Sequence, residues 1–116
     1  IRIAGPDASA DVLQELRASM AAIPAATYRD ALWCFTHPEE RFDFSRITCP
    51  VLLMTGEDDR LAPPSEIGGV AKRIRMNAAN RDVSFEVLPR AGHLCNIEAP
   101  ARYNQHMLHF LSQIAP

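Results

Sequence analysis

The stretch Ile47–Asp59, which reads Ile-Thr-Cys-Pro-Val-Leu-Leu-Met-Thr-Gly-Glu-Asp-Asp, decides the fold class of this chain. Its centre, Val51–Met54, is an unbroken apolar run, which suits a strand buried on both faces of a parallel sheet. Pro50 stands at the start of the run, where a missing N–H is tolerated, and Gly56 ends it. Acidic residues follow at once, and open α/β sheets place site residues in this way, beyond the carboxyl ends of their strands. For this stretch alone, a surface turn of solvated acids is the alternative.

A second strand is predicted at Val83–Leu88, where apolar and polar residues alternate. Between the two strands, the run Pro63–Glu66 indicates a helix start, because proline is tolerated only in a first turn. Apolar residues at helical spacing continue this helix until it fades near Asn77–Asn80. Two strands joined by a helix of crossover length predict a right-handed parallel pair. A last helix opens at Glu98–Pro100, and we expect it to bury a stripe formed by Tyr103, Met107, Phe110, Leu111 and Ile114.

Two amphipathic helices are predicted before the first strand. The first runs from Asp7 to Ile23, and the second from about Thr27 to Thr36. A polar connector, Pro38–Ser45, separates them from the strand. The predicted order is therefore helix, helix, strand, helix, strand, helix, which is an α/β arrangement.

Composition excludes several classes of protein. The chain has 116 residues, of which 47% are hydrophobic and 22% are charged, an ordinary balance for one globular domain. Its net charge of −2 gives no footprint for nucleic acid or for a membrane surface. Cys34, Cys49 and Cys95 form neither a C-x-x-C pair nor a zinc spacing, so we expect no metal and a reducing, cytoplasmic compartment. No apolar segment approaches the ~20 residues of a membrane span.

The residues that could carry chemistry stand at matching places. Asp58 and Asp59 follow the first predicted strand, and His93 follows the second in a glycine-bearing loop. Because neighbouring parallel strands end at the same sheet edge, an acid and the imidazole should come within hydrogen-bond reach. Such a pair is the orienting half of a nucleophile–His–acid triad, in which the acid fixes the histidine tautomer and the histidine moves the proton. A solvated turn aspartate and a helix-capping histidine are the alternatives.

Two motifs resemble those of a known family. The run Gly56–Pro63, Gly-Glu-Asp-Asp-Arg-Leu-Ala-Pro, resembles the acid motif G-x-x-D-x-x-x-P of the α/β-hydrolase fold. Ala91–Leu94, with Glu98 and Pro100 after it, resembles the histidine motif of that family. The joint match extends from Ile47 to the C-terminus and is specific to the superfamily rather than to a substrate.

The resemblance implies the C-terminal part of an α/β-hydrolase fold. Residues 1–45 then look like a helical, cap-like segment with its connector, and residues 46–116 like the C-terminal part of the core. By position in the motif the triad acid is Asp59, with Asp58 as the near alternative, and His93 is the general base.

One element of the family's machinery is absent from the sequence. The nucleophile of α/β-hydrolases sits on a G-x-S-x-G turn, and this chain contains no such pattern. Since the chain order in this family is nucleophile, acid, histidine, we expect the nucleophile and oxyanion hole to precede Ile1. The remaining strands should come from that missing N-terminal part of the fold, from a companion chain or from a homo-oligomer, because a two-stranded sheet is marginal.

The resemblance also implies a reaction. It implies hydrolysis of a small-molecule ester, lactone or related carbonyl compound without a cofactor, and the run Asn96–Pro100 looks most like 3-oxoadipate enol-lactonases. Trp33, Phe35 and Leu94 are candidates for lining a substrate pocket, and core packing is the alternative for Trp33 and Phe35. A non-catalytic α/β-hydrolase-like protein that binds a partner or ligand is the rival interpretation. An unrelated doubly wound domain whose loops match by chance is a third.

Overall fold

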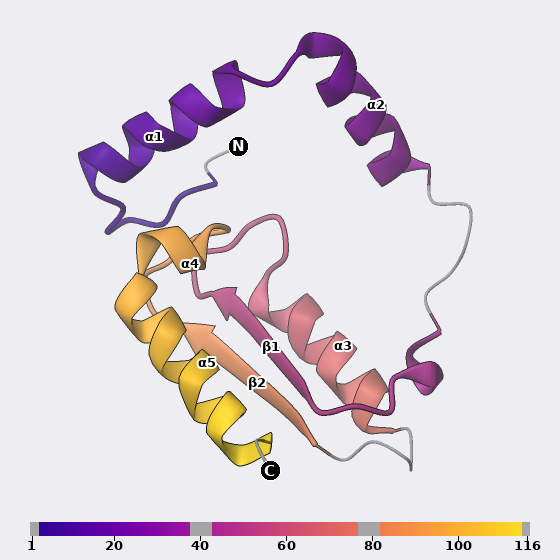
Figure 1. Cartoon of the computed structure of the whole chain (residues 1–116). Helices are drawn as coiled ribbons and strands as arrows, with labels where there is room; N and C mark the ends of the chain where they lie inside the picture. The colour runs from indigo at the N-terminus through magenta and orange to yellow at the C-terminus, as the bar shows by residue number, and fades with distance from the viewer. Residues whose placement is uncertain (1–2, 38–42, 77–81, 115–116) are drawn as a thin grey trace.

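The computed structural model describes residues 3–37, 43–76 and 82–114. The elements in chain order are α1 (Ala10–Ala21), α2 (Ala25–Thr36), the 3-10 turn η1 (Phe44–Arg46), β1 (Val51–Gly56), α3 (Pro64–Arg75), β2 (Val83–Leu88), α4 (Cys95–Glu98) and α5 (Pro100–Ile114) (Figure 1). The predicted order of helices and strands is confirmed, with η1 and α4 as short additions. The predicted fading of the third helix near Asn77–Asn80 lies outside the described residues.

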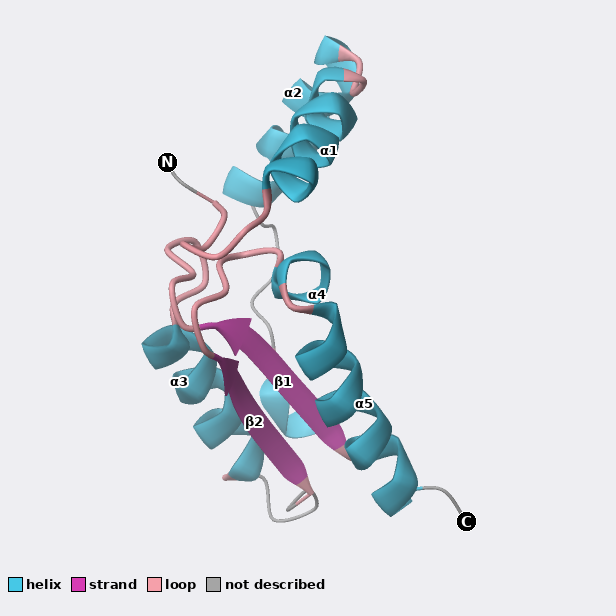
Figure 2. Ribbon diagram, turned by 90° about the vertical axis from the view of Figure 1, so that its left-hand side faces the viewer, coloured by secondary structure: helices cyan, strands magenta, loops and turns pink. Residues whose placement is uncertain are grey.

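The two strands form a parallel pair. β1 and β2 run in register from Val51 opposite Val83 to Gly56 opposite Leu88. Figure 2 shows the pair between α3 on one face and α5 on the other. The fold class predicted from the sequence, α/β with two parallel strands and flanking helices, is therefore confirmed.

Each face of the sheet has its own small core. Under α3, the buried cluster consists of Ala71, Ile74 and Val83, with Phe44 of η1 packed against it. Arg73 lies 4.8 Å above the Phe44 ring and so covers this aromatic side chain from the solvent side. On the α5 side, the buried cluster consists of Leu88, Ala91 and Cys95. This second cluster lies directly beneath the loop that follows β2.

Local signals explain where the helices begin. Helix α1 starts at Ala10 rather than at Asp7, because Ser9 is its N-cap and the Ser9 hydroxyl accepts a hydrogen bond from the N–H of Val12 at 3.2 Å. Helix α3 starts at Pro64, where proline at the first position costs no hydrogen bond.

Burial is incomplete at two apolar stretches. The run Val51–Met54 suits a strand buried on both faces, but these four residues are half-buried. The apolar stripe of α5 is also covered only in part, since Leu111 and Ile114 are 47% and 44% exposed. The reason is the same in both cases: the described residues supply a sheet only two strands wide.

Helices α1 and α2 have no buried residue at all. Figures 1 and 2 show both helices standing clear of the sheet. Their apolar stripes are therefore present, as the periodicity predicts, but no described element covers them.

Candidate active site

The carboxyl ends of the two strands are tied to one another before the site begins. The N–H of Glu57 donates to the carbonyl of Leu88 at 2.8 Å, and the N–H of Asp58 donates to the carbonyl of Ala91 at 2.9 Å. Gly56 makes this approach feasible, because a Cβ there would lie 2.2 Å from the carbonyl oxygens of Ala91 and Gly92. The loop after β1 and the loop after β2 therefore form one layer at the sheet edge.

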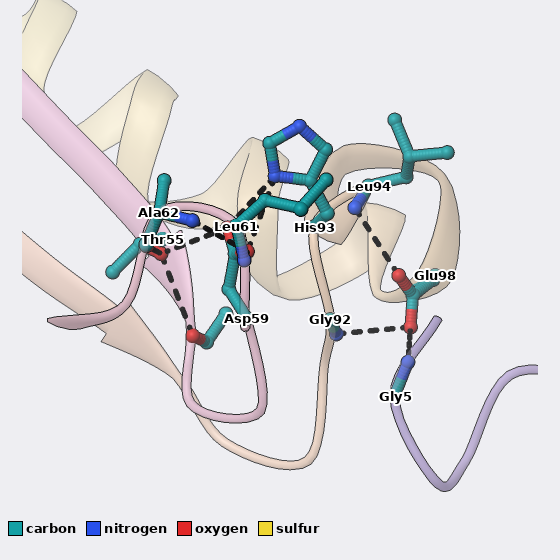
Figure 3. A network of polar contacts seen from close by, with 10 residues as sticks. Gly5, Thr55, Asp59, Leu61, Ala62, Gly92, His93, Leu94 and Glu98 are labelled. Atoms are coloured by element: carbon teal, nitrogen blue, oxygen red, sulfur yellow. Dashed lines mark hydrogen bonds and ion pairs between the residues drawn. The ribbon is translucent and has the colours of Figure 1, made fainter. Parts of the chain in front are cut away.

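Asp59 and His93 meet at this edge (Figure 3). His93 Nδ1 lies 3.0 Å from Asp59 Oδ2 and 3.2 Å from Oδ1, so the predicted contact is confirmed. The ambiguity between the two aspartates is also resolved: Asp59 is 6% exposed and faces the ring, whereas Asp58 is exposed to solvent. Because an ionised carboxylate can only accept, Nδ1 carries the proton in this pair and Nε2 remains an acceptor.

The backbone of its own loop holds the Asp59 carboxylate in place. Oδ1 accepts hydrogen bonds from the N–H of Leu61 at 2.9 Å and of Ala62 at 3.0 Å. The loop is closed in turn by the Thr55 hydroxyl, which donates to the Ala62 carbonyl at 2.9 Å. A buried acceptor with this many donors has little freedom to turn away from His93.

These contacts also keep the carboxylate charged. Burial raises the pKa of Asp59, but the hydrogen bonds from Ala62, His93 and Leu61 together outweigh burial, so its pKa lies below the usual value. Asp59 is therefore an anion at neutral pH, which is the form that orients an imidazole and stabilises its protonated state.

The His93 side chain is 40% exposed, in contrast to its buried partner. One edge of the ring contacts Asp59, and the side chain as a whole is partly open to solvent. This combination suits a proton carrier that must reach a reacting atom.

The other sequence candidates are not gathered around this pair. Trp33 and Phe35 lie on α2 and are 64% and 85% exposed, and the Trp33 ring stacks on His37 with centroids 3.8 Å apart. Leu94, half-buried, directly follows His93. A substrate-lining role for Trp33, Phe35 and Leu94 stays a prediction.

Cys95 is only two residues from His93, but its surroundings do not suit a nucleophile. It is buried in the cluster with Leu88 and Ala91, and burial raises the pKa of its thiol. Since the thiolate is the reactive form, Cys95 is a core residue.

Glu98 makes contacts that the histidine motif does not predict. The carboxylate of Glu98 accepts hydrogen bonds from the backbone N–H groups of Gly92 and Leu94, on either side of His93 (Figure 3). Among the described residues, no group of three or more His, Cys, Asp or Glu side chains is placed to hold a metal ion. In that same part of the chain, every helix is too short or too polar to cross a membrane.

An anionic aspartate and a histidine therefore lie side by side at adjoining ends of two parallel strands that are flanked by helices. The structure of a serine hydrolase involved in carbazole degradation (CarC enzyme) matches 96% of this chain and 43% of its own, with a TM-score of 0.70 and 21% identity. This likeness establishes the fold, which is part of an α/β-hydrolase fold.

Sequence relatives are hydrolases as well. "Putative carbamate hydrolase RutD" of Escherichia coli is 34% identical over 79 residues, which cover 65% of this chain and 27% of the relative. A thermophilic esterase from Thermogutta terrifontis matches 62% of this chain and 24% of its own, with 30% identity and a TM-score of 0.55. No protein-family model matches the chain. The chain is related to hydrolases of the α/β-hydrolase superfamily, and it spans about a quarter of the curated relative's length.

Proposed function

We propose that Asp59 and His93 are the acid and the histidine of a nucleophile–His–acid triad that hydrolyses a small ester, lactone or carbamate. The single observation that carries the proposal is the contact of His93 Nδ1 with Asp59 Oδ2 at 3.0 Å. Asp59 is buried and anionic while His93 is partly open, which is the division of roles that a triad needs.

In this proposal, His93 Nε2 takes the proton of the nucleophile as the nucleophile attacks the substrate carbonyl. The resulting imidazolium is stabilised by the Asp59 carboxylate, and His93 then returns the proton to the leaving group. The nucleophile and the oxyanion hole come from a part of the fold outside these 116 residues, or from a companion chain. The same part supplies further strands beside β1 and surfaces that cover the exposed apolar faces of the helices.

The relatives suggest the range of substrates. The names of the matched proteins include an esterase and a carbamate hydrolase. Esters, lactones and carbamates all present a carbonyl carbon to the nucleophile and lose an oxygen or nitrogen leaving group, so one triad serves each of them. The enol-lactonase resemblance of Asn96–Pro100 makes a lactone one of the substrates to test.

A p-nitrophenyl ester assay tests the proposal in two preparations. The 116-residue chain alone is expected to turn over no faster than its His93→Ala variant, because a base without nucleophile and oxyanion hole lacks most of the machinery. A protein that joins this chain to the G-x-S-x-G portion of a hydrolase should be active, and His93→Ala should abolish that activity. Full activity of the His93→Ala protein would refute the proposal.

The rival interpretation, a non-catalytic binding or regulatory protein, draws on one observation. The 116 residues contain no G-x-S-x-G turn. The sequence encoded upstream of Ile1 discriminates between the two: a nucleophile turn there supports the hydrolase. An upstream segment that completes the fold without Ser, Cys or Asp at the nucleophile position supports the binding protein.

A further inference from the structure

We propose that Glu98 is a positioning residue, which clamps the histidine loop (residues 89–94) to the segment 3–5 and thereby holds His93 Nδ1 toward Asp59. The proposal rests on the proposed function, because positioning matters to the reaction only if His93 acts in it. Its structural content can nevertheless be tested without turnover.

The Glu98 carboxylate has three backbone partners on two separate segments. Oε2 accepts hydrogen bonds from the N–H of Gly5 at 2.6 Å and of Gly92 at 3.0 Å. Oε1 accepts from the N–H of Leu94 at 3.2 Å. Gly92 and Leu94 flank His93, so this one side chain holds the backbone N–H groups of both neighbours of the histidine (Figure 3).

The two segments are in direct backbone contact. The N–H of His93 donates to the carbonyl of Ile3 at 2.7 Å. A Cβ on Gly92 would lie 2.5 Å from Gly5 N and from Ile3 O, and a Cβ on Gly5 would lie 2.6 Å from Arg90 O. Only glycine at these two positions permits so close an approach, and the approach leaves little room for a solvent molecule between the strands of backbone.

The contact between the two segments brings two backbone N–H donors together, and a carboxylate can accept from both. Gly5 and Gly92 both present N–H groups toward one point, and two donors cannot bond to each other. An acceptor without any proton is needed between them, and the ionised Glu98 side chain offers two acceptor oxygens and no donor. Charge-assisted hydrogen bonds of this kind are about twice as strong as neutral ones.

Glutamine cannot replace it. A glutamine side chain has one acceptor oxygen, and its NH₂ group is a donor. If its oxygen accepted from Gly5 and Gly92, its NH₂ group would face the N–H of Leu94. If the amide were flipped, its NH₂ group would face the N–H groups of Gly5 and Gly92. Either orientation sets a donor against a donor beside His93.

The consequence reaches Asp59 through the backbone. The His93 side chain is 40% exposed, so packing alone does not fix the direction of its ring. The ring points at Asp59 because the loop backbone directs it there. A loop released from Glu98 should therefore populate the Nδ1–H···Asp59 contact less, and the histidine should lose its single tautomer.

The loop offers a matched control. Glu57 also accepts a hydrogen bond from this loop, from the N–H of Arg90 at 3.0 Å, but it is exposed, and its carboxylate has this one backbone partner among the residues that the structure describes. In Glu57→Gln the amide oxygen can keep that bond. Glu57→Gln thus makes the same chemical change on the same loop, without placing a donor against a donor.

The experiment compares the 116-residue chain with its Glu98→Gln and Glu57→Gln variants. Amide hydrogen exchange, read by mass spectrometry and by NMR, is expected to rise about tenfold or more at Gly5, Gly92 and Leu94 in Glu98→Gln, the factor for one lost charge-assisted bond. Exchange in β1 and β2 should stay unchanged. The ¹⁵N signals of the His93 ring should shift from the Nδ1–H tautomer toward a mixture in Glu98→Gln and remain unchanged in Glu57→Gln.

A second variant keeps the test decisive if Glu98→Gln fails to fold. Glu98→Asp retains two acceptor oxygens but is one methylene shorter, so it should show faster exchange at Gly5 and a smaller change in the His93 ring signals. Ring signals equal to wild type in either folded Glu98 variant, despite faster exchange at Gly5, would overturn the proposal. An inactive hydrolase whose ring signals respond as expected would instead count against the proposed function alone.

Discussion

Replacing Asp59 with asparagine should separate the stability contributed by this side chain from its catalytic role. The asparagine oxygen can still accept from the N–H groups of Leu61 and Ala62, so the loop keeps its geometry. Its NH₂ group, however, must face His93 Nδ1 as a donor, which forces the ring into the opposite tautomer with the proton on Nε2. In a protein that carries the nucleophile, turnover should fall on the order of 10⁴-fold, as it does for the equivalent change in serine proteases.

The expected loss of stability follows from the contacts. Hydrogen bonds to charged groups contribute about 1.5–3 kcal/mol and neutral ones about 0.5–1.5 kcal/mol, so the two backbone bonds to Oδ1 should lose about 2 kcal/mol together. The bond to His93 adds less, because that side chain is 40% exposed and solvent screens it. Removing a buried charge offsets part of the loss. We therefore expect a net decrease of about 1–2 kcal/mol in the free energy of unfolding.

The dependence on pH has a definite sign. The pKa of Asp59 is lower in the folded chain than its ordinary value of about 3.9. Its ionised form therefore contributes stability above that ordinary value, and the contribution is lost as the pH falls through the folded pKa. The difference in stability between wild type and Asp59→Asn should thus be full at pH 7 and shrink below about pH 4.

Urea unfolding followed by far-ultraviolet circular dichroism is the suitable measurement, with wild type and variants at one protein concentration, because association makes stability depend on concentration. Fluorescence is a poor substitute, because the single tryptophan, Trp33, is exposed on α2 and reports on that helix. Asp58→Asn is the matched control, since Asp58 is the exposed neighbour and should change stability by no more than about 0.5 kcal/mol. If Asp59→Asn were as stable as Asp58→Asn at pH 7, or if the difference grew on acidification, the reasoning would be refuted.

Two further predictions concern folding. Gly56→Ala should cost about 3 kcal/mol or more in the free energy of unfolding, because its Cβ would lie 2.2 Å from two carbonyl oxygens. The same substitution at Gly69, inside α3 with nothing within 4 Å of the added Cβ, should stabilise the chain by about 0.5–1 kcal/mol, and equal effects at the two sites would contradict the close approach. Light scattering should show that the 116-residue chain associates. The edge of β1 that faces away from β2 and the apolar side chains of α2 have no cover among the described residues. A monodisperse monomer that unfolds cooperatively would disprove this.

The parts of the fold that the sequence predicts well are those with local causes. Val83–Leu88 matches the observed strand at both ends, because alternation is a property of the strand itself. The start of α3 follows from its prolines in the same way. The choice of Asp59 over Asp58 came from its position in the resembling motif, and the structure adds that the N–H groups of Leu61 and Ala62 reach the Asp59 carboxylate.

Burial was harder to predict, because it depends on what lies opposite a stripe. Periodicity indicates which face of a helix is apolar. It does not indicate whether a partner surface exists, and within the described residues α1 and α2 have no buried residue. The apolar run Val51–Met54 is half-buried for the same reason, since β2 is its one neighbouring strand.

Glu98 illustrates a limit of another kind. Sequence patterns are built from side chains, whereas the partners of Glu98 are backbone N–H groups, which every residue except proline carries. Nothing in the letters at positions 5, 92 and 94 requires an acceptor. The requirement arises only when two segments far apart in the chain are brought together with their donors facing one point. In the sequence, this contact is visible only as the two glycines, Gly5 and Gly92, because a side chain at either position would collide with the opposite backbone. A glutamate that follows a candidate catalytic histidine by five residues is therefore best interpreted together with the glycines it joins, rather than as one more acid on a helix.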